Sequence, residues 1–258
     1  MTTDVRTRRR PGTPCWASLM AGRAGQARDF YGALFGWEFT AGPPQLGAYM
    51  LAVRDGLRVA GIGEAPPEPH RPVSWTTMLA ADDVDRAAEL VRECGGTVGI
   101  GPLNVGDDGR LAIAVDPSGA VFGIWQGGLF SGAEAAGVPG SVGWSELVTQ
   151  DAAMVGKFYE AVFGLGLERT GEAPDADRAV LTVGGNAVAG IRGLGRALPR
   201  DRGAHWMTSF AVADIDAVSR LAVRLGGRVL TPSHPGPYGP TTTLADPEGS
   251  PFCLLTLP

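Results

Sequence analysis

Glu146 is the side chain in this sequence best placed for acid–base chemistry. It lies in an apolar stretch between Trp144 and Val148. A carboxylate on such a strand is expected to be desolvated, which suits it to act as a general base or to anchor a hydroxyl or amine of a ligand. The alternative is an ion pair with an arginine from the stretch 192–202, which would make Glu146 structural.

His234 and Tyr238 are candidates for a second proton-handling group. Both lie in Ser233–Pro240, a segment rich in Pro and Gly that is expected to form a rigid loop over a cavity. Loop histidines are also commonly incidental, so a bystander role for His234 stays open. The other histidines, His70 and His205, precede predicted strands and are expected to be solvated loop residues.

The three cysteines do not indicate a disulfide framework or a zinc site. Cys15, Cys94 and Cys253 are odd in number and far apart in the sequence, so reduced, buried thiols are expected. The sequence also lacks a phosphate-binding P-loop, a Gly-x-Ser-x-Gly nucleophile elbow and a dinucleotide-binding glycine motif.

Composition and charge exclude several classes of protein. The chain has 258 residues, 44% hydrophobic and 19% charged, which is the balance of a globular protein with a sizeable core. A net charge of −5 argues against a general nucleic-acid binder. No apolar run is long enough to cross a membrane, and the arginines of the first ten residues precede no hydrophobic signal region. A cytoplasmic protein with no membrane partner is expected.

The elements that position these side chains belong to an internal sequence repeat. A series of residues in the first half recurs in the second half with the same order and nearly the same spacing. Trp16, Leu19, Phe30, Tyr31 and Gly36 recur as Trp144, Leu147, Phe158, Tyr159 and Gly164; Trp75, Asp83 and Asp85 recur as Trp206, Asp214 and Asp216; and Asp116-Pro117-Ser118-Gly119 recurs as Asp246-Pro247-Glu248-Gly249.

Each half reads as two β-α-β-β-β modules, which gives an α+β fold with four modules. In the second half, Asp151 and Asp214 are expected to cap two helices and Gly164 to end the first of them. Gly184-Gly185 predicts a tight hairpin. We therefore predict a basic, disordered arm over 1–13, a first domain over 14–126, a flexible linker over 127–140 and a second domain over 141–258.

These motifs resemble the vicinal oxygen chelate superfamily, which includes glyoxalase I, bleomycin-resistance proteins, fosfomycin-modifying enzymes and extradiol dioxygenases. The resemblance rests on the Trp-Ser-Glu-Leu strand, the Phe-Tyr-Glu-Ala-Val-Phe-Gly helix end, the Asp-Ile-Asp helix start and the Asp-Pro-x-Gly turn. It implies two tandem half-barrel domains, with modules that pair either within a half or across the halves. It does not fix the reaction.

Members of that superfamily often hold a divalent metal through His, Gln or Glu on the inner strands. Carried over to this chain, the ligand positions fall on Trp16 and Trp144, near Thr76 and Met207, and near Gly123 and Cys253. None of these is a usual ligand for a hard metal ion. A shift of one or two residues brings in Glu146 or His205, still short of the three ligands that a zinc or iron site needs. No metal site and no cofactor are predicted.

Aromatic and apolar side chains are expected to line the two cavities instead. Strand alternation assigns Trp16, Ser18, Thr76, Met78, Gly123 and Trp125 to the first cavity, and Trp144, Glu146, Met207, Ser209, Cys253 and Leu255 to the second. Tryptophan walls favour flat, apolar ligands. The alternative is that these tryptophans are ordinary core residues.

The sequence thus predicts a protein that binds and transforms a mid-sized, aromatic small molecule such as a secondary metabolite or antibiotic, without a three-ligand metal. One alternative is a resistance protein that sequesters a drug or metabolite without changing it. Another is a metal-dependent lyase or dioxygenase, which would carry about one tightly held metal ion per chain. Both a monomer and a homodimer fit the repeat.

Overall fold

The computed structural model describes residues 9–66, 73–170, 177–200, 202–236 and 239–256. Its order of elements is four β-α-β-β-β modules, which confirms the predicted α+β fold. Module 1 comprises β1 (Pro14–Ala21), α1 (Ala24–Phe35), β2 (Glu38–Ala41), β3 (Tyr49–Arg54) and β4 (Leu57–Glu64). Module 2 comprises β5 (Trp75–Ala80), α2 (Val84–Glu93), β6 (Thr97–Val105), β7 (Gly109–Val115) and β8 (Val121–Gly127).

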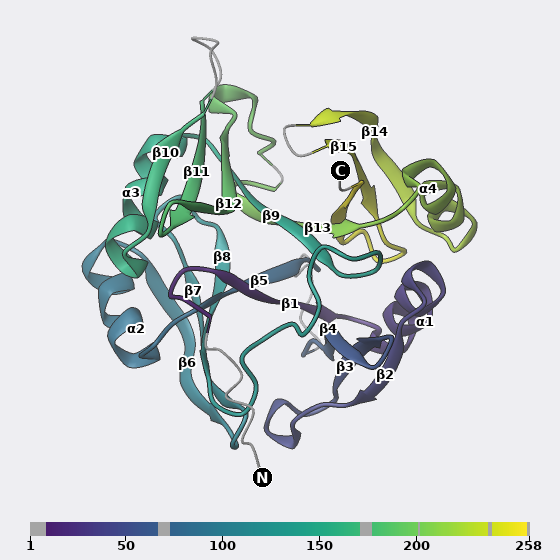
Figure 1. Ribbon diagram of the computed structural model, residues 1–258, viewed down its shortest axis with the longest axis horizontal. Helices are drawn as coiled ribbons and strands as arrows, with labels where there is room; N and C mark the ends of the chain where they lie inside the picture. Colours follow the sequence, from purple (N-terminus) through teal and green to yellow (C-terminus); the bar gives the residue numbers. More distant parts are fainter. Residues whose placement is uncertain (1–8, 67–72, 171–176, 201, 237–238, 257–258) are drawn as a thin grey trace. The chain divides into compact units, whose positions relative to one another are not determined.

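The second half repeats this order. Module 3 comprises β9 (Val142–Thr149), α3 (Ala152–Phe163), β10 (Gly166–Arg169), β11 (Arg178–Val183) and β12 (Asn186–Gly193). Module 4 comprises β13 (His205–Ala211), α4 (Ile215–Arg224), β14 (Arg228–Gly236), β15 (Gly239–Ala245) and β16 (Pro251–Leu255). Figure 1 shows each helix beside the strands of its own module.

The helix ends in the second half lie where the capping residues predict. The Asp151 carboxylate accepts a hydrogen bond from the Met154 amide at 2.8 Å, and the Asp214 carboxylate accepts one from the Ala217 amide at 2.8 Å. Gly164 ends α3 in the left-handed conformation, with φ of 67°. These local signals therefore fix where both helices begin and where α3 ends.

The strands of the described residues form two sheets of eight. Modules 1 and 2 contribute the order β2-β3-β4-β1-β5-β8-β7-β6, and modules 3 and 4 contribute β10-β11-β12-β9-β13-β16-β15-β14. Strand pairing therefore follows the two halves of the chain.

The predicted loop over Ser233–Pro240 is wrong for most of its length. Residues 233–236 continue β14, and His234 pairs with Thr241 of β15 in an antiparallel register. The prolines are tolerated in this strand because β14 is the last strand of its sheet, where a residue without an N–H removes no hydrogen bond on the open side. The corresponding stretch 102–110 likewise lies mostly in the hairpin of β6 and β7.

Side-chain packing divides the chain differently from strand pairing. Two compact units emerge, each with one module from either half of the chain. Unit 1 comprises Met1–Cys15, Met78–Gly132 and Leu147–Trp206, and unit 2 comprises Trp16–Thr77, Ala133–Glu146 and Met207–Pro258. The sequence leaves two ways of pairing modules open, and both are present. Modules of the same half share a sheet, whereas modules of different halves share a hydrophobic core.

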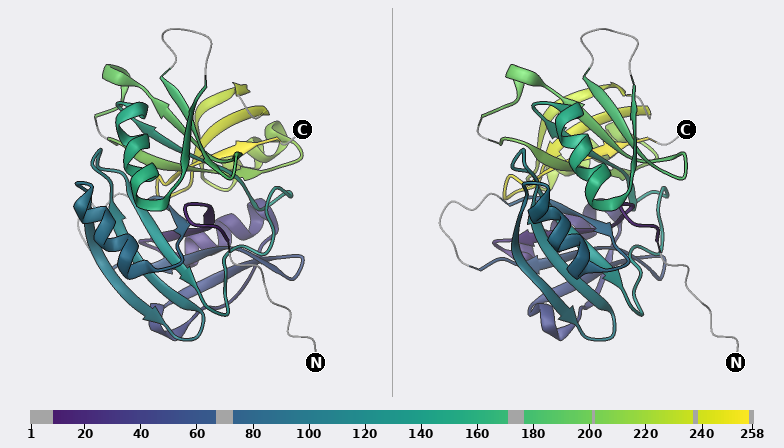
Figure 2. Two further views of the ribbon diagram at one scale, coloured as in Figure 1. Left: turned by 60° about the vertical axis from the view of Figure 1, so that its left-hand side comes forward. Right: turned by 90° about the vertical axis from the view of Figure 1, so that its left-hand side faces the viewer.

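Unit 1 is built around helices α2 and α3, which pack against each other. Figure 2 shows α2 lying on the strands β6 and β7 of its own module. Phe122, Leu147, Tyr159 and Leu181 are fully buried at the centre of the core.

Unit 2 has the same design, with α1 packed against α4. The fully buried side chains of its core include Leu19, Tyr31, Phe210 and Phe252. Phe210 and Phe252 lie next to each other, with ring centroids 6.2 Å apart in an edge-to-face arrangement.

The repeated Trp, Tyr and Asp residues form a buried hydrogen-bonded triad in unit 1. The Trp206 indole donates to the Tyr159 hydroxyl at 2.9 Å, and that hydroxyl donates to the Asp116 carboxylate at 2.9 Å. The other Asp116 oxygen accepts from the Ser118 and Ala120 amides at 2.8 and 3.0 Å. Burial, and then the charge of Asp116, raise the pKa of Tyr159 well above its usual value.

Unit 2 contains the matching triad. The Trp75 indole donates to the Tyr31 hydroxyl at 3.0 Å, and that hydroxyl donates to the Asp246 carboxylate at 3.0 Å. Burial raises the pKa of Asp246, against the hydrogen bonds from Ser250, Tyr31 and Glu248. The repeated Asp, Tyr and Trp residues therefore have a structural role. In each triad they connect the closing turn of one module to a helix of a second module and a strand of a third.

The segment between the halves and the start of the chain are both bonded to the units. The Arg58 guanidinium pairs with the Glu134 carboxylate at 2.8 Å, and the Trp37 indole donates to the Gly140 carbonyl at 2.6 Å. Near the N-terminus, the Gly12 amide donates to the Ala80 carbonyl at 2.8 Å. None of the described helices is both long and apolar enough to cross a membrane.

Candidate functional site

The residues predicted to line the cavities lie on the sheet faces turned away from the helices. In β1, Ala17, Leu19 and Ala21 belong to the core beneath the helices. Because side chains alternate along a strand, Trp16 and Ser18 point to the opposite face. The same alternation assigns Thr76 and Met78 of β5, Gly123 and Trp125 of β8, and Met207 and Ser209 of β13 to this face.

On module 1, this face carries a hydrogen-bonded network centred on Tyr49. The Tyr49 hydroxyl accepts from the Trp16 indole at 2.9 Å and shares a hydrogen bond of 2.9 Å with the Ser18 hydroxyl. Burial raises the pKa of Tyr49, whose side chain is 7% exposed. Tyr49 therefore stays a neutral phenol at neutral pH. The sequence gives no sign of its role, because β3 carries no recognisable motif.

Two glycines of β4 make room for this network. Gly61 lies opposite Ser18 and Gly63 lies opposite Tyr49 in the strand register. A Cβ atom at Gly61 would collide with the Tyr49 hydroxyl, and one at Gly63 would meet the Tyr49 ring. Only glycine lets Tyr49 lie across the sheet and reach Trp16.

Replacing Gly61 by alanine is expected to lower the free energy of unfolding by about 1–3 kcal/mol, because the Tyr49 ring must leave its place. Urea unfolding followed by circular dichroism measures the loss, and tryptophan emission reports the change around Trp16. Gly25→Ala is the control, since a Cβ at Gly25 meets nothing within 4 Å. A Gly61→Ala protein with wild-type stability and emission would contradict the packing described for Tyr49.

On module 2, the same face is filled by apolar side chains. Met78 pairs with Gly123 in the register of β5 and β8, and its thioether covers the place where a Cβ at Gly123 would lie. The Trp125 indole donates to the Phe130 carbonyl at 2.8 Å. Nearby, burial raises the pKa of the Cys15 thiol to about 12, so this thiol stays protonated at neutral pH.

On module 4, the corresponding row of side chains is polar. Cys253 lies opposite Ser209 on one side and opposite Thr243 on the other. The Thr243 hydroxyl lies 3.4 Å from the Cys253 sulfur. The equivalent row in module 2 consists of Met78, Gly123 and Ile113. The two halves have therefore diverged at these matched positions.

The remaining predicted residues of the second half are only partly accounted for by contacts. Trp144 and Glu146 are half-buried on β9, on the face away from Ser145 and Leu147, and both have interactions within the chain. His234 is exposed, and its Nδ1 lies 3.1 Å from the Pro232 carbonyl. Tyr238 lies outside the described residues, as does His70.

The expectation that His205 is a solvated loop residue is wrong. His205 is the first residue of β13 and is half-buried. Its Nδ1 lies 2.8 Å from the Gly203 carbonyl, so Nδ1 carries the proton and Nε2 carries the lone pair when the ring is neutral. Burial lowers the pKa of His205; the charges of Arg202 and Arg192 lower it further, whereas the hydrogen bond to Gly203 raises it.

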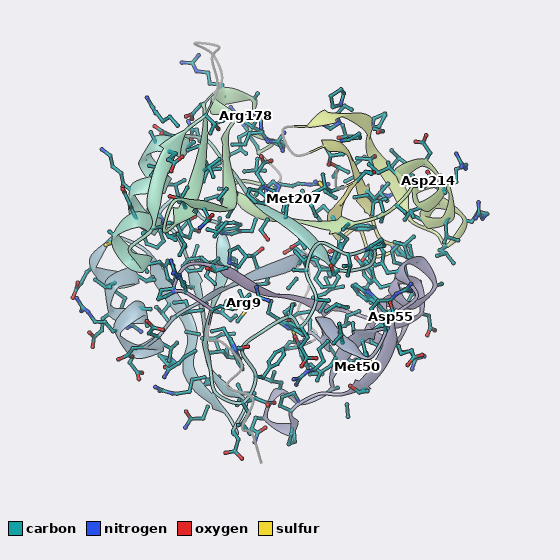
Figure 3. The ribbon with its side chains drawn as sticks, in the orientation of Figure 1. Arg9, Met50, Asp55, Arg178, Met207 and Asp214 are labelled. Atoms are coloured by element: carbon teal, nitrogen blue, oxygen red, sulfur yellow. The ribbon has the colours of Figure 1, made fainter. Side chains whose placement is uncertain are left out.

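Two arginines of module 3 were also not singled out by the sequence. Arg178 of β11 and Arg192 of β12 lie directly opposite each other in an antiparallel register. Ala179 and Ile191, their neighbours along the strands, belong to the helix-side core, so both arginines point to the other face. Figure 3 labels Arg178 at the start of β11. Their spacing in the sequence carries no signal, because strand register alone brings them together.

The residues at the family's metal-ligand positions do not fit a three-ligand metal centre. The Trp16 indole is a donor bound to Tyr49, and the Gly123 position is covered by the Met78 side chain. Within the described ranges, no three His, Cys, Asp or Glu side chains lie close enough together to hold a metal ion. The chemistry proposed below is therefore assigned to side chains of the chain itself.

Comparisons with known proteins agree with the fold. Residues 145–255 match the glyoxalase-like domain family, and residues 15–124 match the glyoxalase/bleomycin resistance protein/dioxygenase superfamily. The chain is 38% identical to the anthracycline biosynthesis protein DauV of Streptomyces sp. strain C5, over 97% of this chain and 95% of that protein.

Solved structures are similar at much lower identity, which shows the fold alone. The Mn(II)-bound glyoxalase of Novosphingobium aromaticivorans superposes with a TM-score of 0.64 at 16% identity, covering 95% of this chain and 82% of that one. The 2,3-dioxygenase LapB of Pseudomonas sp. KL28 superposes with a TM-score of 0.64 at 16% identity, covering 96% and 91%. The chain belongs to the vicinal oxygen chelate superfamily, as a member with two glyoxalase-like domains in tandem.

Proposed function

We propose that the protein binds a mid-sized, flat aromatic molecule of the secondary-metabolite type and transforms it by proton transfer. The observation that carries this proposal is the 38% identity to an anthracycline biosynthesis protein over nearly the full length of both chains. Anthracyclines have fused aromatic rings, and flat apolar ligands of this kind gain most from contact with indole side chains.

The tryptophans of the chain support an aromatic ligand. Of the six tryptophans, Trp37, Trp75 and Trp206 belong to the helix-side cores. Trp16, Trp125 and Trp144 lie on the opposite sheet faces, where Trp16 and Trp125 are buried and Trp144 is half-buried. A ring stacked on the Trp144 indole would contribute about 0.5–1.5 kcal/mol beyond the area it buries.

Glu146 is the base in this proposal, with His234 or Tyr238 as the second proton-handling group. A carboxylate can remove a proton from carbon or oxygen next to a carbonyl without help from a metal ion, provided that it lies within hydrogen-bonding distance of that proton. A sequestering protein is the second candidate, because stacking of a flat ring on an indole requires no proton transfer.

Titration with an anthracycline aglycone tests the binding step. Quenching of tryptophan emission is expected to saturate with a dissociation constant of about 1–100 μM. Trp144→Phe is expected to weaken binding, whereas Trp37→Phe, in the helix-side core, is the control. A saturated fused-ring compound of the same size is expected to bind about 2- to 13-fold more weakly, since it cannot stack and loses about 0.5–1.5 kcal/mol.

Product analysis separates an enzyme from a sequestering protein. After incubation of the bound aglycone with the protein, liquid chromatography with mass spectrometry detects any new compound. A product that grows with time supports catalysis, whereas tight binding of an unchanged aglycone supports sequestration. Binding no tighter than that of the saturated compound would contradict an aromatic ligand.

A further inference from the structure

We propose that Ser209, Thr243 and Thr231, which share one row across the sheet of module 4, bind a neutral group of the ligand that carries several hydroxyls. This inference rests on the proposed function, because it assigns the polar part of the same flat ligand. Hydroxyls on the aromatic ring and a sugar attached to the ring both supply this chemistry. All three residues belong to unit 2.

The strand register brings these side chains into one row. Ser209 of β13 lies opposite Cys253 of β16. On its other side, Cys253 lies opposite Thr243 of β15, which in turn lies opposite Thr231 of β14. Neighbouring strands are about 4.7–4.9 Å apart, so one ligand group can reach two neighbouring side chains of the row.

The row lies on the sheet face turned away from the helices. Phe210 and Leu244, the neighbours of Ser209 and Thr243 along their strands, belong to the helix-side core. Because side chains alternate along a strand, Ser209 and Thr243 point the other way. Glu146, the proposed base, is on this face of β9, which is the neighbour of β13 in the sheet. A group bound at the row therefore lies on the same face as the base.

The burial of Ser209 points to a bound molecule. Ser209 is 8% exposed, and none of the described residues forms a hydrogen bond with its hydroxyl. A serine hydroxyl has one donor and two acceptor sites, and leaving it buried without a partner costs free energy. Because buried polar side chains normally have a partner, a ligand oxygen is the group that this hydroxyl fits.

Thr243 also has hydrogen-bonding capacity left for a ligand. Its hydroxyl lies 3.4 Å from the Cys253 sulfur, and this weak contact uses only one of its three sites. Cys253 has a further interaction within the chain, so no role is assigned to its thiol. In the next row, by contrast, the Thr241 hydroxyl donates to the Leu254 carbonyl at 3.0 Å and is used within the sheet.

The matched row of module 2 contains no hydroxyl. The same strand register joins Met78, Gly123, Ile113 and Ile100. The sheet therefore forms equally well without hydroxyls at these positions, and its architecture does not explain them in module 4. Hydroxyls carry no charge and both donate and accept hydrogen bonds. The row of module 4 therefore favours a neutral group with several hydroxyls over an ion.

Equilibrium dialysis with three anthraquinones tests the proposal. The probes are anthraquinone, a tetrahydroxyanthraquinone and the glucoside of a monohydroxyanthraquinone. A hydroxyl-bearing probe is expected to bind about 2- to 13-fold more tightly than anthraquinone for each hydrogen bond that it gains. A gain confined to the tetrahydroxy compound assigns the row to ring hydroxyls, whereas a gain confined to the glucoside assigns it to a sugar.

Variants that each remove one hydroxyl locate the gain. Ser209→Ala and Thr243→Val are each expected to weaken binding of the favoured probe by about 2- to 13-fold and to leave anthraquinone binding unchanged. Thr243→Ser keeps the hydroxyl and is expected to retain the gain. Thr97→Val removes an exposed hydroxyl from β6 in unit 1; it is the control and is expected to change the binding of neither probe.

Urea unfolding of the free protein separates ligand binding from a structural role. Because no described residue bonds to the Ser209 hydroxyl, Ser209→Ala is expected to leave the urea midpoint unchanged or to raise it. A clearly lower midpoint would mean that the fold itself uses this hydroxyl, and it would overturn the proposal.

The binding outcomes distinguish this inference from the proposed function. If the hydroxyl-bearing probes bind no more tightly than anthraquinone, the row is not their site, and aromatic binding stays intact. The same conclusion follows if their gain survives in both Ser209→Ala and Thr243→Val. If none of the three probes binds, the proposed aromatic ligand fails, and the hydroxyl site fails with it.

Discussion

Replacing Asp116 by alanine is expected to lower the free energy of unfolding by about 3–5 kcal/mol. The Asp116 carboxylate is 3% exposed and accepts the Tyr159 hydroxyl together with the amides of its own turn. Its removal leaves the Tyr159 hydroxyl and the turn amides without an acceptor in a buried place, where each unsatisfied donor costs about 1–3 kcal/mol. Urea unfolding of the full chain measures the loss.

Other variants test whether the triad acts as a unit. Asp246→Ala is expected to cost a similar amount, because Asp246 accepts the Tyr31 hydroxyl in the same way. The double variant Tyr159→Phe, Asp116→Ala is expected to lose less free energy of unfolding than the sum of the two single changes. Each single change already removes the same hydrogen bond, between the Tyr159 hydroxyl and the Asp116 carboxylate. Asp29→Ala, in an exposed ion pair with Arg28, is the control and is expected to cost less than about 1 kcal/mol. A loss below about 1 kcal/mol for Asp116→Ala would contradict a structural role for the triad.

Replacing Glu146 by glutamine is expected to reduce turnover of the bound aglycone by about 10²–10⁴-fold, because the amide cannot accept the proton that the carboxylate removes. The change keeps the shape of the side chain, so ring binding measured by tryptophan quenching is expected to change little. Product formation, followed by liquid chromatography with mass spectrometry, gives the rate.

The exposed carboxylate of Glu168 on β10 provides the matched control for this substitution. Glu168→Gln is expected to leave turnover unchanged. If Glu146→Gln formed product at the wild-type rate, Glu146 would not be the base, and an ion-pairing role would explain its presence on β9. A protein that no longer folds, judged by circular dichroism, would likewise assign Glu146 a structural role.

The order of elements could be predicted from the sequence because its signals are local. Asp151 and Asp214 begin helices through bonds to amides three residues away, and Gly164 ends a helix by its own conformation. Because the sequence repeats, each helix or strand predicted in one half is also predicted at the matched position of the other half. The stretch Ser233–Pro240 failed because proline usually marks a loop, whereas at the edge of a sheet it does not interrupt a strand.

The polar part of the candidate site could not be predicted because it depends on register between strands. Arg178 and Arg192 are fourteen positions apart by their numbers, and only the hairpin of β11 and β12 places them opposite each other. His205 was read as a loop residue because a stretch rich in Gly, Arg and Pro precedes it, yet β13 begins at this residue. Tyr49 is likewise recognisable only from its partners Trp16 and Ser18.

Strand alternation, in contrast, placed the apolar residues on the intended face. Met78 and Trp125 point away from the core that contains Leu79 and Ile124, as the two-residue period requires. What alternation could not reveal is that Met78 covers Gly123, because the length and direction of a neighbouring side chain are not encoded in the pattern.

Each compact unit takes one module from either half of the chain. A fragment that ends at the boundary between the repeats therefore carries half of two cores and the whole of neither, although its sequence looks like a complete domain. Each half, expressed alone, is expected to be unstable and to aggregate, because the apolar side chains of its half-cores stay exposed. The two halves are expected to fold only when they are expressed together. Either core can therefore form only when both repeats are present together.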